Sequence, residues 1–181
     1  VKGMIVNHVV RNVKKLVPAW SLPGAVKFND AVANGRGKSY TAPSVGPNDI
    51  AVLQYTGGTT GVSKGAVLLH RNLVANILQA EAWYQPALKK IPAGEQIVTV
   101  CALPLYHIFG FNTNMMLSMR MGGCNILIPN ARDIPSVLKE LASQRFHSFP
   151  AVSTLFNAIA NHADFGKVDW SNLKISIGGG M

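Results

Sequence analysis

The chain has 181 residues, of which 48% are hydrophobic and 14% are charged. This length and composition suffice for a folded domain with a buried core, and they exclude a disordered chain. The formal net charge is +9, and residues 1–40 carry +6 of it, because seven basic residues and one acidic residue occur there. Such a flank attracts nucleic acid, an anionic membrane surface or an anionic substrate, or it is a solvated surface, which we favour.

Cysteine and histidine usage argues against disulfide and metal frameworks. Cys101 and Cys124 are too few for a set of disulfides, and both lie in apolar runs, so we expect buried thiols and a cytoplasmic location. The five histidines show no metal-ligand spacing, so we predict no metal ligand. Because the chain does not begin with Met and ends in a glycine-rich turn, we expect a piece of a longer protein.

The first part of the chain has a weak pattern. Apolar spacing predicts a helix over residues 9–17, and a second helix is expected within 21–34. Glycines and prolines in 35–47 indicate a connector. We therefore predict two regions, a basic N-terminal segment with its connector over 1–48 and an α/β subdomain over 49–181.

From residue 49 onward strands and helices alternate. This alternation predicts an α/β fold with a mainly parallel sheet. The expected strands cover 50–54 (buried), 66–69, 97–103, 125–128, 146–150 and 173–177, and the helices cover 71–84, 108–120, 133–144 and a stretch from 153. Ligands bind at the carboxyl ends of strands in such sheets, so we expect the loops that open at Tyr55, Pro104 and Gly178 to converge.

The loop over residues 55–65, Y-T-G-G-T-T-G-V-S-K-G, is the strongest functional signal. Glycines let backbone N–H groups approach a ligand closely, and successive N–H groups form an anion-binding concavity. Hydroxyl groups and Lys64 add further donors, so the loop suits a polyphosphate better than an apolar or cationic ligand. The alternative is an ordinary flexible loop rich in turn-forming residues, and we favour phosphate binding. The loop is not a Walker A motif, because Gly65 and a strand-like run follow the lysine.

A second motif, Pro-Leu-Tyr-His over 104–107, ends a predicted strand. His107 would stand at the strand's carboxyl end, where it donates to a carboxylate or phosphate, or it is a structural residue. Four methionines between 115 and 121 are core residues or line a ligand channel. Phe109 and Phe111 are likewise core residues or flank the mouth of that channel.

These motifs resemble those of the adenylate-forming enzymes. Their signature loop is Y-T-S-G-T-T-G-x-P-K-G, and here Gly58 replaces its Ser and Ser63 replaces its Pro. This variant and its continuation over 66–73 look like bacterial long-chain fatty acid–CoA ligases. Residues 104–107 match that family's P-[LM]-[FY]-H motif, and 176–181 resemble its glycine-rich segment. The resemblance covers most of this chain but a minority of the family's length, so it implies a partial subdomain of the large domain.

The resemblance implies a two-step reaction with ATP, Mg²⁺ and coenzyme A. A long-chain fatty acid is activated to an acyl-adenylate, and the thiol of coenzyme A then displaces AMP. Lys64 and His107 are implied as catalytic residues. The residues implied in binding the nucleotide are Tyr55, Thr56, Gly57, Gly58, Thr59, Thr60, Gly61, Val62, Ser63, Lys64, Gly65 and Ala66. Those implied in binding the acid or acyl-adenylate are His107, Phe111, Gly178, Gly179 and Gly180.

Several alternatives stay open. The family's adenine-binding, ribose-binding and catalytic-lysine motifs do not occur here, so we predict that the chain alone does not catalyse adenylation. Another adenylate-forming enzyme, for aryl or amino acids, is one rival, and a basic membrane-surface binding module is another. The expected partners are ATP, the fatty acid and coenzyme A, without nucleic acid. Peripheral contact with the inner membrane and a homodimeric parent protein are left open.

Overall fold

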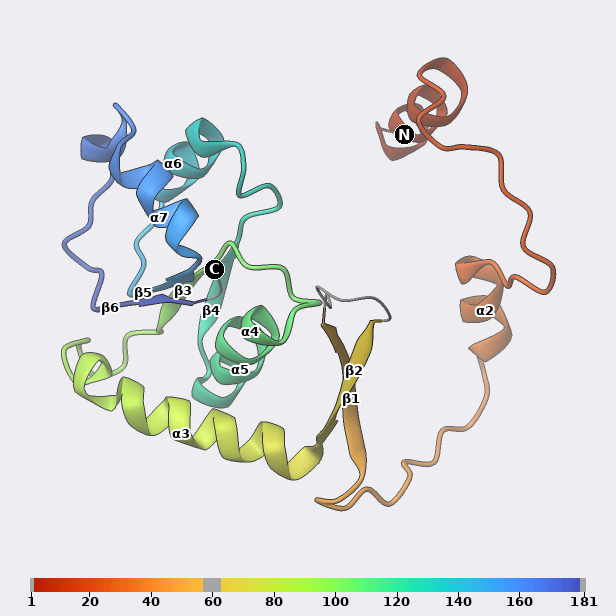
Figure 1. Cartoon of the computed structure of the whole chain (residues 1–181), viewed down its shortest axis with the longest axis horizontal. Helices are drawn as coiled ribbons and strands as arrows, with labels where there is room; N and C mark the ends of the chain where they lie inside the picture. Colours follow the sequence, from red (N-terminus) through yellow and green to blue (C-terminus); the bar gives the residue numbers. More distant parts are fainter. Residues whose placement is uncertain (1, 57–62, 180–181) are drawn as a thin grey trace. The chain divides into compact units, whose positions relative to one another are not determined.

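The computed structural model describes residues 2–56 and 63–179. The chain divides into two compact units, Val1–Ser44 and Val45–Met181, which are described separately here (Figure 1). The boundary at residue 48 that the sequence suggests between the basic segment and the α/β subdomain stays a prediction.

The N-terminal unit contains short helices with no buried side chain. α1 (Lys2–His8) continues into the π-helix η1 (Val9–Val13), and α2 (Phe28–Gly35) follows after an extended stretch. The helix predicted over 9–17 is therefore placed too late. The observed helix ends at Val13 rather than at residue 17, because Lys15 adopts a left-handed φ of 49°, which breaks the helical hydrogen-bond pattern.

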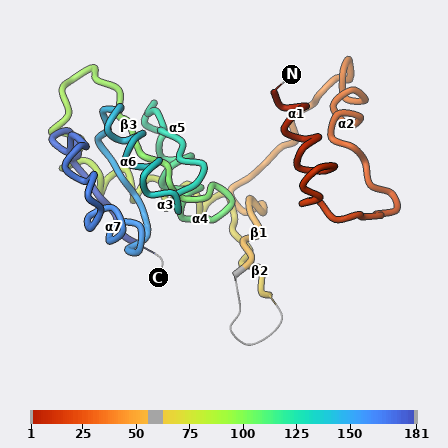
Figure 2. The backbone as a smooth tube through the Cα atoms, turned by 90° about the horizontal axis from the view of Figure 1, so that it is seen from above, coloured from red at the N-terminus to blue at the C-terminus, as the bar shows by residue number. Residues whose placement is uncertain are grey.

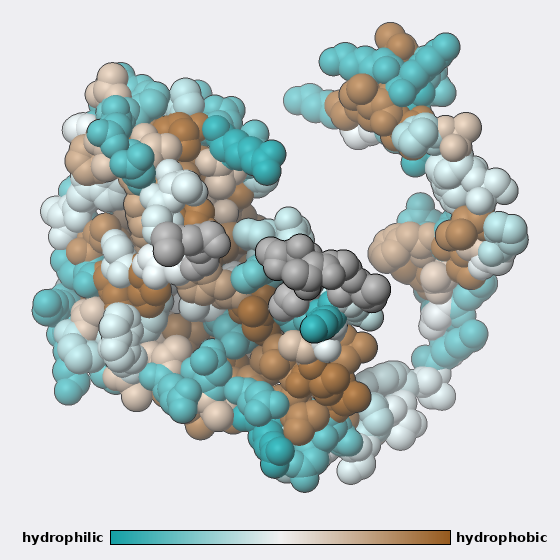
Figure 3. Space-filling model, in the orientation of Figure 1, coloured by the Kyte–Doolittle hydropathy of each residue, from teal (hydrophilic) through white to brown (hydrophobic). Residues whose placement is uncertain are grey.

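The second unit begins with a two-stranded antiparallel ribbon. β1 (Ile50–Thr56) pairs with β2 (Lys64–Leu69), as Figure 2 shows. The prediction that residues 50–54 form a buried strand of the parallel sheet is wrong, because Ile50 and Leu53 are 60% and 54% exposed. Figure 3 shows apolar surface over this ribbon. The physical reason is the length of the connection, since residues 57–63 are too few for the crossover that parallel strands need.

Helix α3 (His70–Leu88) follows β2 directly. Its start is closed by the Asn72 side chain, whose Oδ1 accepts the Leu69 N–H at 2.9 Å. The helix runs four residues beyond the predicted end at 84, and Pro86 lies within its last turn.

Four parallel strands form the main sheet, which confirms the predicted fold class. Their order is β4-β3-β5-β6, and every neighbouring pair is parallel. The strands are β3 (Val98–Cys101), β4 (Cys124–Leu127), β5 (Ser148–Ala151) and β6 (Ile175–Gly178).

Helices cover both faces of this sheet (Figure 1). The connection from β3 to β4 lies on the face that also carries α3, and it consists of α4 (Ile108–Gly110), η2 (Phe111–Met116) and α5 (Leu117–Met121). The opposite face carries α6 (Ile134–Ala142) and α7 (Ser153–Ala160), and the 3₁₀ turn η3 (Phe165–Lys167) follows α7. Because the chain moves from β3 outward to β4 and then returns to β5 on the other side of β3, the direction of winding reverses between β3 and β5. Ligands bind at such a reversal point in open α/β sheets.

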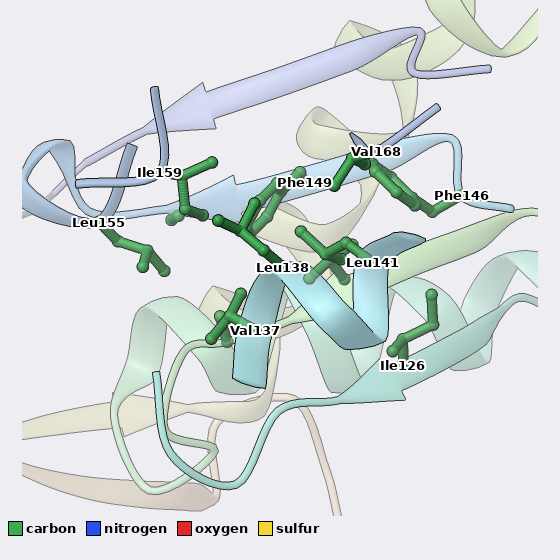
Figure 4. Close-up of a cluster of buried hydrophobic side chains, with 12 residues drawn as sticks. Ile126, Val137, Leu138, Leu141, Phe146, Phe149, Leu155, Ile159 and Val168 are labelled. Atoms are coloured by element: carbon green, nitrogen blue, oxygen red, sulfur yellow. The ribbon is translucent and has the colours of Figure 1, made fainter. Parts of the chain in front are cut away.

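The larger core lies between the sheet and the α6–α7 layer (Figure 4). Val137 and Leu141 of α6 and Ile159 of α7 pack against Phe149 of β5, and all four side chains are buried. A smaller core joins α3 and α5 beneath the other face through Ile77, Tyr84 and Leu117. The two clusters therefore pack helices against both faces of the sheet.

The two cysteines differ in exposure. Cys101 is buried in β3, and burial raises the pKa of its thiol. Cys124 is exposed, so the prediction of two buried thiols is wrong for this residue, which begins the edge strand β4. Within residues 2–56 and 63–179, no helix is both long and apolar enough to cross a membrane.

Candidate active site

The segment after β3 places His107 at the carboxyl edge of the sheet. His107 is the N-cap of α4, and its Nδ1 accepts the backbone N–H of Phe109 at 3.2 Å. An imidazole nitrogen that accepts a hydrogen bond carries no proton, so the ring proton lies on Nε2. The side chain is exposed. It therefore presents an N–H donor outward, which suits a carboxylate or phosphate oxygen.

A close backbone approach shapes this segment. A Cβ built on Gly110 would lie 2.6 Å from the carbonyl oxygen of Pro104, a separation that real Cβ atoms do not show. The same carbonyl accepts the His107 N–H at 3.1 Å. Glycine at 110 thus lets α4 fold back onto the turn that carries the histidine.

The helix behind His107 is fastened to the sheet. Asn114 of η2 is fully buried, and its Nδ2 donates to the Val100 carbonyl at 3.0 Å. Asn125 of β4 in turn donates to the backbone carbonyl of Asn114 at 3.0 Å. π-helical turns are frequent at functional sites, and these two bonds fix this one against β3 and β4.

Two of the three loops expected to converge do meet. The Phe109 ring lies so close to Gly179 that a Cβ on the glycine would be 3.2 Å from ring atoms Cε1 and Cζ. Gly179 also donates its N–H to the Ala151 carbonyl at 3.2 Å, which extends the β5–β6 pairing to the edge of the sheet. Gly178, the last residue of β6, lies beside Phe156 instead. The Pro104 and Gly178 loops therefore share one location.

The third loop departs from the ribbon rather than from the parallel sheet. Thr56 pairs with Lys64 at the end of the ribbon where the connecting residues join the two strands, and Tyr55 pairs with Gly65. The ring of Tyr55 covers Gly65, where a Cβ would be 3.4 Å from ring atom Cζ. Ala66 pairs with Gln54, and Ser63 and Ala66 are exposed.

Some predicted site residues lie outside the described ranges. These are Gly180 and the loop residues Gly57, Gly58, Thr59, Thr60, Gly61 and Val62. The roles proposed for them remain predictions from the sequence.

A hollow of about 500 Å³ lies between the ribbon side of α3 and the His107 helix. Leu68 of β2, Asn76 of α3, and Phe109 and Thr113 contribute to its lining. The Asn112 Nδ2 donates to the Asn76 Oδ1 at 2.8 Å and joins the two helices across it. The hairpin that carries the glycine loop and the helix that carries His107 therefore border the same space.

Phe111, predicted to contact substrate, is half-buried and does not line this hollow. Sequence reasoning left Phe109 undecided between core and channel mouth. The sequence did contain a signal that Phe109 lines this hollow. Phe109 and Thr113 are four residues apart, which places both on one face of a helix.

A second hollow, of about 530 Å³, lies at the reversal point of the sheet. Leu103 and Pro104 after β3, Arg132 after β4 and Val152 after β5 line it. The segment 103–107 thus runs between two hollows. No cluster of three or more His, Cys, Asp or Glu side chains that could hold a metal ion occurs among the residues that the structure describes.

These features describe an α/β protein with a doubly wound parallel sheet and a candidate binding site near the carboxyl ends of its strands. The family model described as "AMP-binding enzyme" matches residues 5–181. The chain therefore belongs to the AMP-binding enzyme family.

Relatives and solved structures agree with this membership. The chain is 51% identical to a long-chain-fatty-acid–CoA ligase of Escherichia coli O6:H1 over 99% of its own length and 31% of the relative's. It is 45% identical to the ligase of that name from Haemophilus influenzae, over 99% and 32% of the two lengths. The ATP-bound crystal structure of MatB from Rhodopseudomonas palustris matches with a TM-score of 0.66 at 26% identity, over 83% of this chain and 28% of that one. The chain thus spans about a third of the length of the curated relatives it matches.

Proposed function

We propose that this chain is part of a long-chain fatty acid–CoA ligase that forms AMP. Such an enzyme activates the fatty acid with ATP and then joins the acyl group to coenzyme A. The observation that carries the proposal is that the hairpin with the glycine loop and the helix after His107 both line one hollow. Identities of 45–51% with long-chain-fatty-acid–CoA ligases over 99% of the chain support the same reaction.

His107 would position the carboxylate. In the first step a carboxylate oxygen attacks the α-phosphorus of ATP, and the bond from that phosphorus to the pyrophosphate oxygen breaks. The outward Nε2–H of His107 would donate to the carboxylate oxygen that does not attack. Because Nδ1 is held by the Phe109 N–H, the donor is oriented before the acid binds.

The loop at the end of the ribbon would hold the leaving pyrophosphate. An attack by an anion on a polyanion requires compensation of the charge that develops on the leaving group. Lys64, which lies opposite Thr56 at the last pair of the ribbon, would supply a positive charge there. Backbone N–H and hydroxyl groups of residues 56–61 would add donors.

The hollow beside Phe109 would take the acyl chain. Nine residues line it and none is charged: Leu68, Asn72, Leu73, Asn76, Ala80, Ile108, Phe109, Asn112 and Thr113. An amino acid substrate needs a partner for its ammonium group, so this lining favours a fatty acid or an aryl acid over an amino acid. Each CH₂ group buried there contributes about 0.8 kcal/mol.

The proposal extends to Mg²⁺, to the cellular location of the enzyme and to its oligomeric state. The described residues provide no cluster that fits a protein-held metal, and Mg²⁺ is commonly bound through substrate phosphates and water. We infer a cytoplasmic enzyme with peripheral contact at the inner membrane and a homodimeric parent protein. Sedimentation of the full-length polypeptide tests the last point, and cell fractionation tests the first two.

The test uses His107→Ala in the full-length polypeptide, with His162→Gln as the matched control. Pyrophosphate exchange driven by palmitate should fall roughly a hundredfold in His107→Ala. The apparent affinity for ATP should stay close to that of the parent, and the control should retain full exchange. If His107→Ala used palmitate as well as the parent does, the assigned role of His107 would be wrong.

A further inference from the structure

The pairing between β3 and β5 is short at the point where the winding of the sheet reverses. β3 pairs with β4 at four positions and β5 pairs with β6 at four, but β3 and β5 are bridged at one, between Thr99 and Ser148. The carboxyl ends of β3 and β5 are therefore joined less tightly than those of the other neighbouring strands. Ligands of open α/β sheets bind in the crevice at such a place.

A side chain replaces β5 as the partner of β3 just beyond this bridge. The Val98 carbonyl accepts the N–H of His147, directly before β5, at 2.8 Å. Alternate carbonyls of a strand point to the same neighbour, so the Val100 carbonyl also faces the β5 side. A continued ladder would give it a backbone N–H of β5. Instead it accepts the Asn114 Nδ2 at 3.0 Å, so the amide of Asn114 ends the pairing.

Asn114 also belongs to the turn that shapes the candidate active site. Its side chain is fully buried, so its amide is held by the bond to β3 and not by water. The preceding residue, Thr113, lines the hollow beside Phe109, and its hydroxyl donates to the Phe109 carbonyl at 2.6 Å. The Phe109 ring in turn meets Gly179 after β6. The spacing of β3 and β5 is thus linked through one short turn to the lining of the hollow.

We propose that Asn114 is a positioning residue for the acid substrate. Its amide would keep β3 and β5 apart at their carboxyl ends and hold Thr113 and Phe109 in place beside the hollow. Without this amide the Val100 carbonyl is free to pair with β5, the strands close up, and the turn shifts. Asn114 lines neither hollow beside the 103–107 segment, so it acts through β3 and Phe109. The inference rests on the proposed function, which assigns the acid to the hollow beside Phe109.

A neighbouring asparagine separates positioning from plain structural support. Asn125 donates its Nδ2 to the backbone carbonyl of Asn114, also at 3.0 Å. It does so from β4, on the side of β3 away from β5. Both asparagines therefore hold the same turn by one bond of equal length, but Asn114 alone of the two bonds to the Val100 carbonyl on the β5 side. A residue that merely closed a hydrogen bond would change stability and leave the affinity for the acid alone.

The experiment measures equilibrium dialysis of palmitate, without ATP, against the full-length polypeptide. Asn114→Ala should raise the Kd for palmitate roughly tenfold, because a small displacement of the lining is enough to lose the fit. The Kd for ATP should stay within about twofold of the parent's. Asn125→Ala, the matched control, should keep both constants within about twofold. Urea midpoints of the two variants show how much stability each has lost.

A second variant covers the case in which Asn114→Ala fails to fold. Asn114→Asp keeps the shape of the side chain, and its carboxylate cannot donate to the Val100 carbonyl. It should weaken palmitate binding in the same direction and leave ATP binding unchanged. An unchanged Kd for palmitate in either folded variant would overturn the inference, as would an equal change in Asn125→Ala.

The parent protein separates this inference from the proposed reaction. A parent that binds palmitate but shows no palmitate-dependent pyrophosphate exchange would remove the ligase reaction, and the dialysis data would still decide the role of Asn114. A parent that does not bind palmitate would overturn the positioning role itself. Exchange by the parent, with weaker palmitate binding in Asn114→Ala and not in Asn125→Ala, would support both.

Discussion

The ring of Phe109 occupies the space that a side chain at Gly179 would need, with Cε1 and Cζ both 3.2 Å from the ideal Cβ position. One residue belongs to the helix after β3 and the other follows β6, and 70 positions separate them in the sequence. This contact joins the segment that carries His107 to the residue that follows β6 at the edge of the sheet.

Gly179→Val should therefore displace the Phe109 ring and disturb the site without unfolding the protein. A shift of about 1 Å near the chemistry costs up to a hundredfold in rate, so we expect a tenfold to hundredfold loss in palmitate-dependent pyrophosphate exchange. Phe109→Leu in the same protein should restore part of that loss. Gly166→Ala, where nothing lies within 4 Å, serves as the control. A Gly179→Val enzyme with the parent's exchange rate would exclude a role for this contact.

The sequence predicts the parallel sheet and its helices well, because buried strands and amphipathic helices have different apolar periods. The convergence of the Pro104 and Gly178 loops follows from the rule that parallel strands end at one edge. The separate ribbon of β1 and β2 is not predicted, although the eleven residues between the strands expected at 50–54 and 66–69 are fewer than a parallel crossover needs. The place of the Phe109 ring was undecided because it depends on contact with a residue far along the chain.

Gly110→Ala should destabilise the protein, although alanine is the better helix former. The new Cβ would meet the Pro104 carbonyl at 2.6 Å and the Leu103 Cβ at 3.1 Å, and a backbone oxygen cannot rotate away. Overpacking of this kind costs about 1–3 kcal/mol of the free energy of unfolding. Urea unfolding followed by circular dichroism measures it, with Gly166→Ala as the matched change. Equal midpoints for both variants would contradict the close approach.

Glu95 should matter to stability through His147 and hardly at all through Arg145. The His147 ring is buried, its Nδ1 accepts the Val98 N–H at 3.0 Å, and its Nε2 lies 3.0 Å from a Glu95 carboxylate oxygen. The same oxygen lies 3.1 Å from the guanidinium of Arg145, whose side chain is 56% exposed.

Glu95→Ala leaves a buried N–H without its acceptor, so we expect a loss of about 1–3 kcal/mol in the free energy of unfolding. Arg145→Ala removes an exposed ion pair and should cost less than about 1 kcal/mol. Urea midpoints of the two variants decide between the contacts. Equal losses would show that the bond to His147 contributes nothing beyond the surface pair.

Tyr84 should make the protein sensitive to alkaline pH. Burial raises the pKa of its phenol, and the neighbouring Ser148 hydroxyl opposes that shift only in part. The unfolded chain loses this proton near pH 10, whereas the folded protein holds it to higher pH. Stability is therefore unaffected below about pH 10 and falls as the pH rises above it, because the unfolded state then binds fewer protons than the folded state.

Tyr84→Phe removes the ionisable group and leaves the ring, which is 2% exposed, in the core between α3 and α5. The variant should consequently lose less stability than the parent between pH 8.5 and about pH 10.5. Urea midpoints at the two pH values measure the difference, and Tyr106→Phe is the control, because that side chain is 88% exposed. An identical alkaline loss in Tyr84→Phe and the parent would mean that the buried phenol does not titrate on unfolding, and that other groups cause the sensitivity.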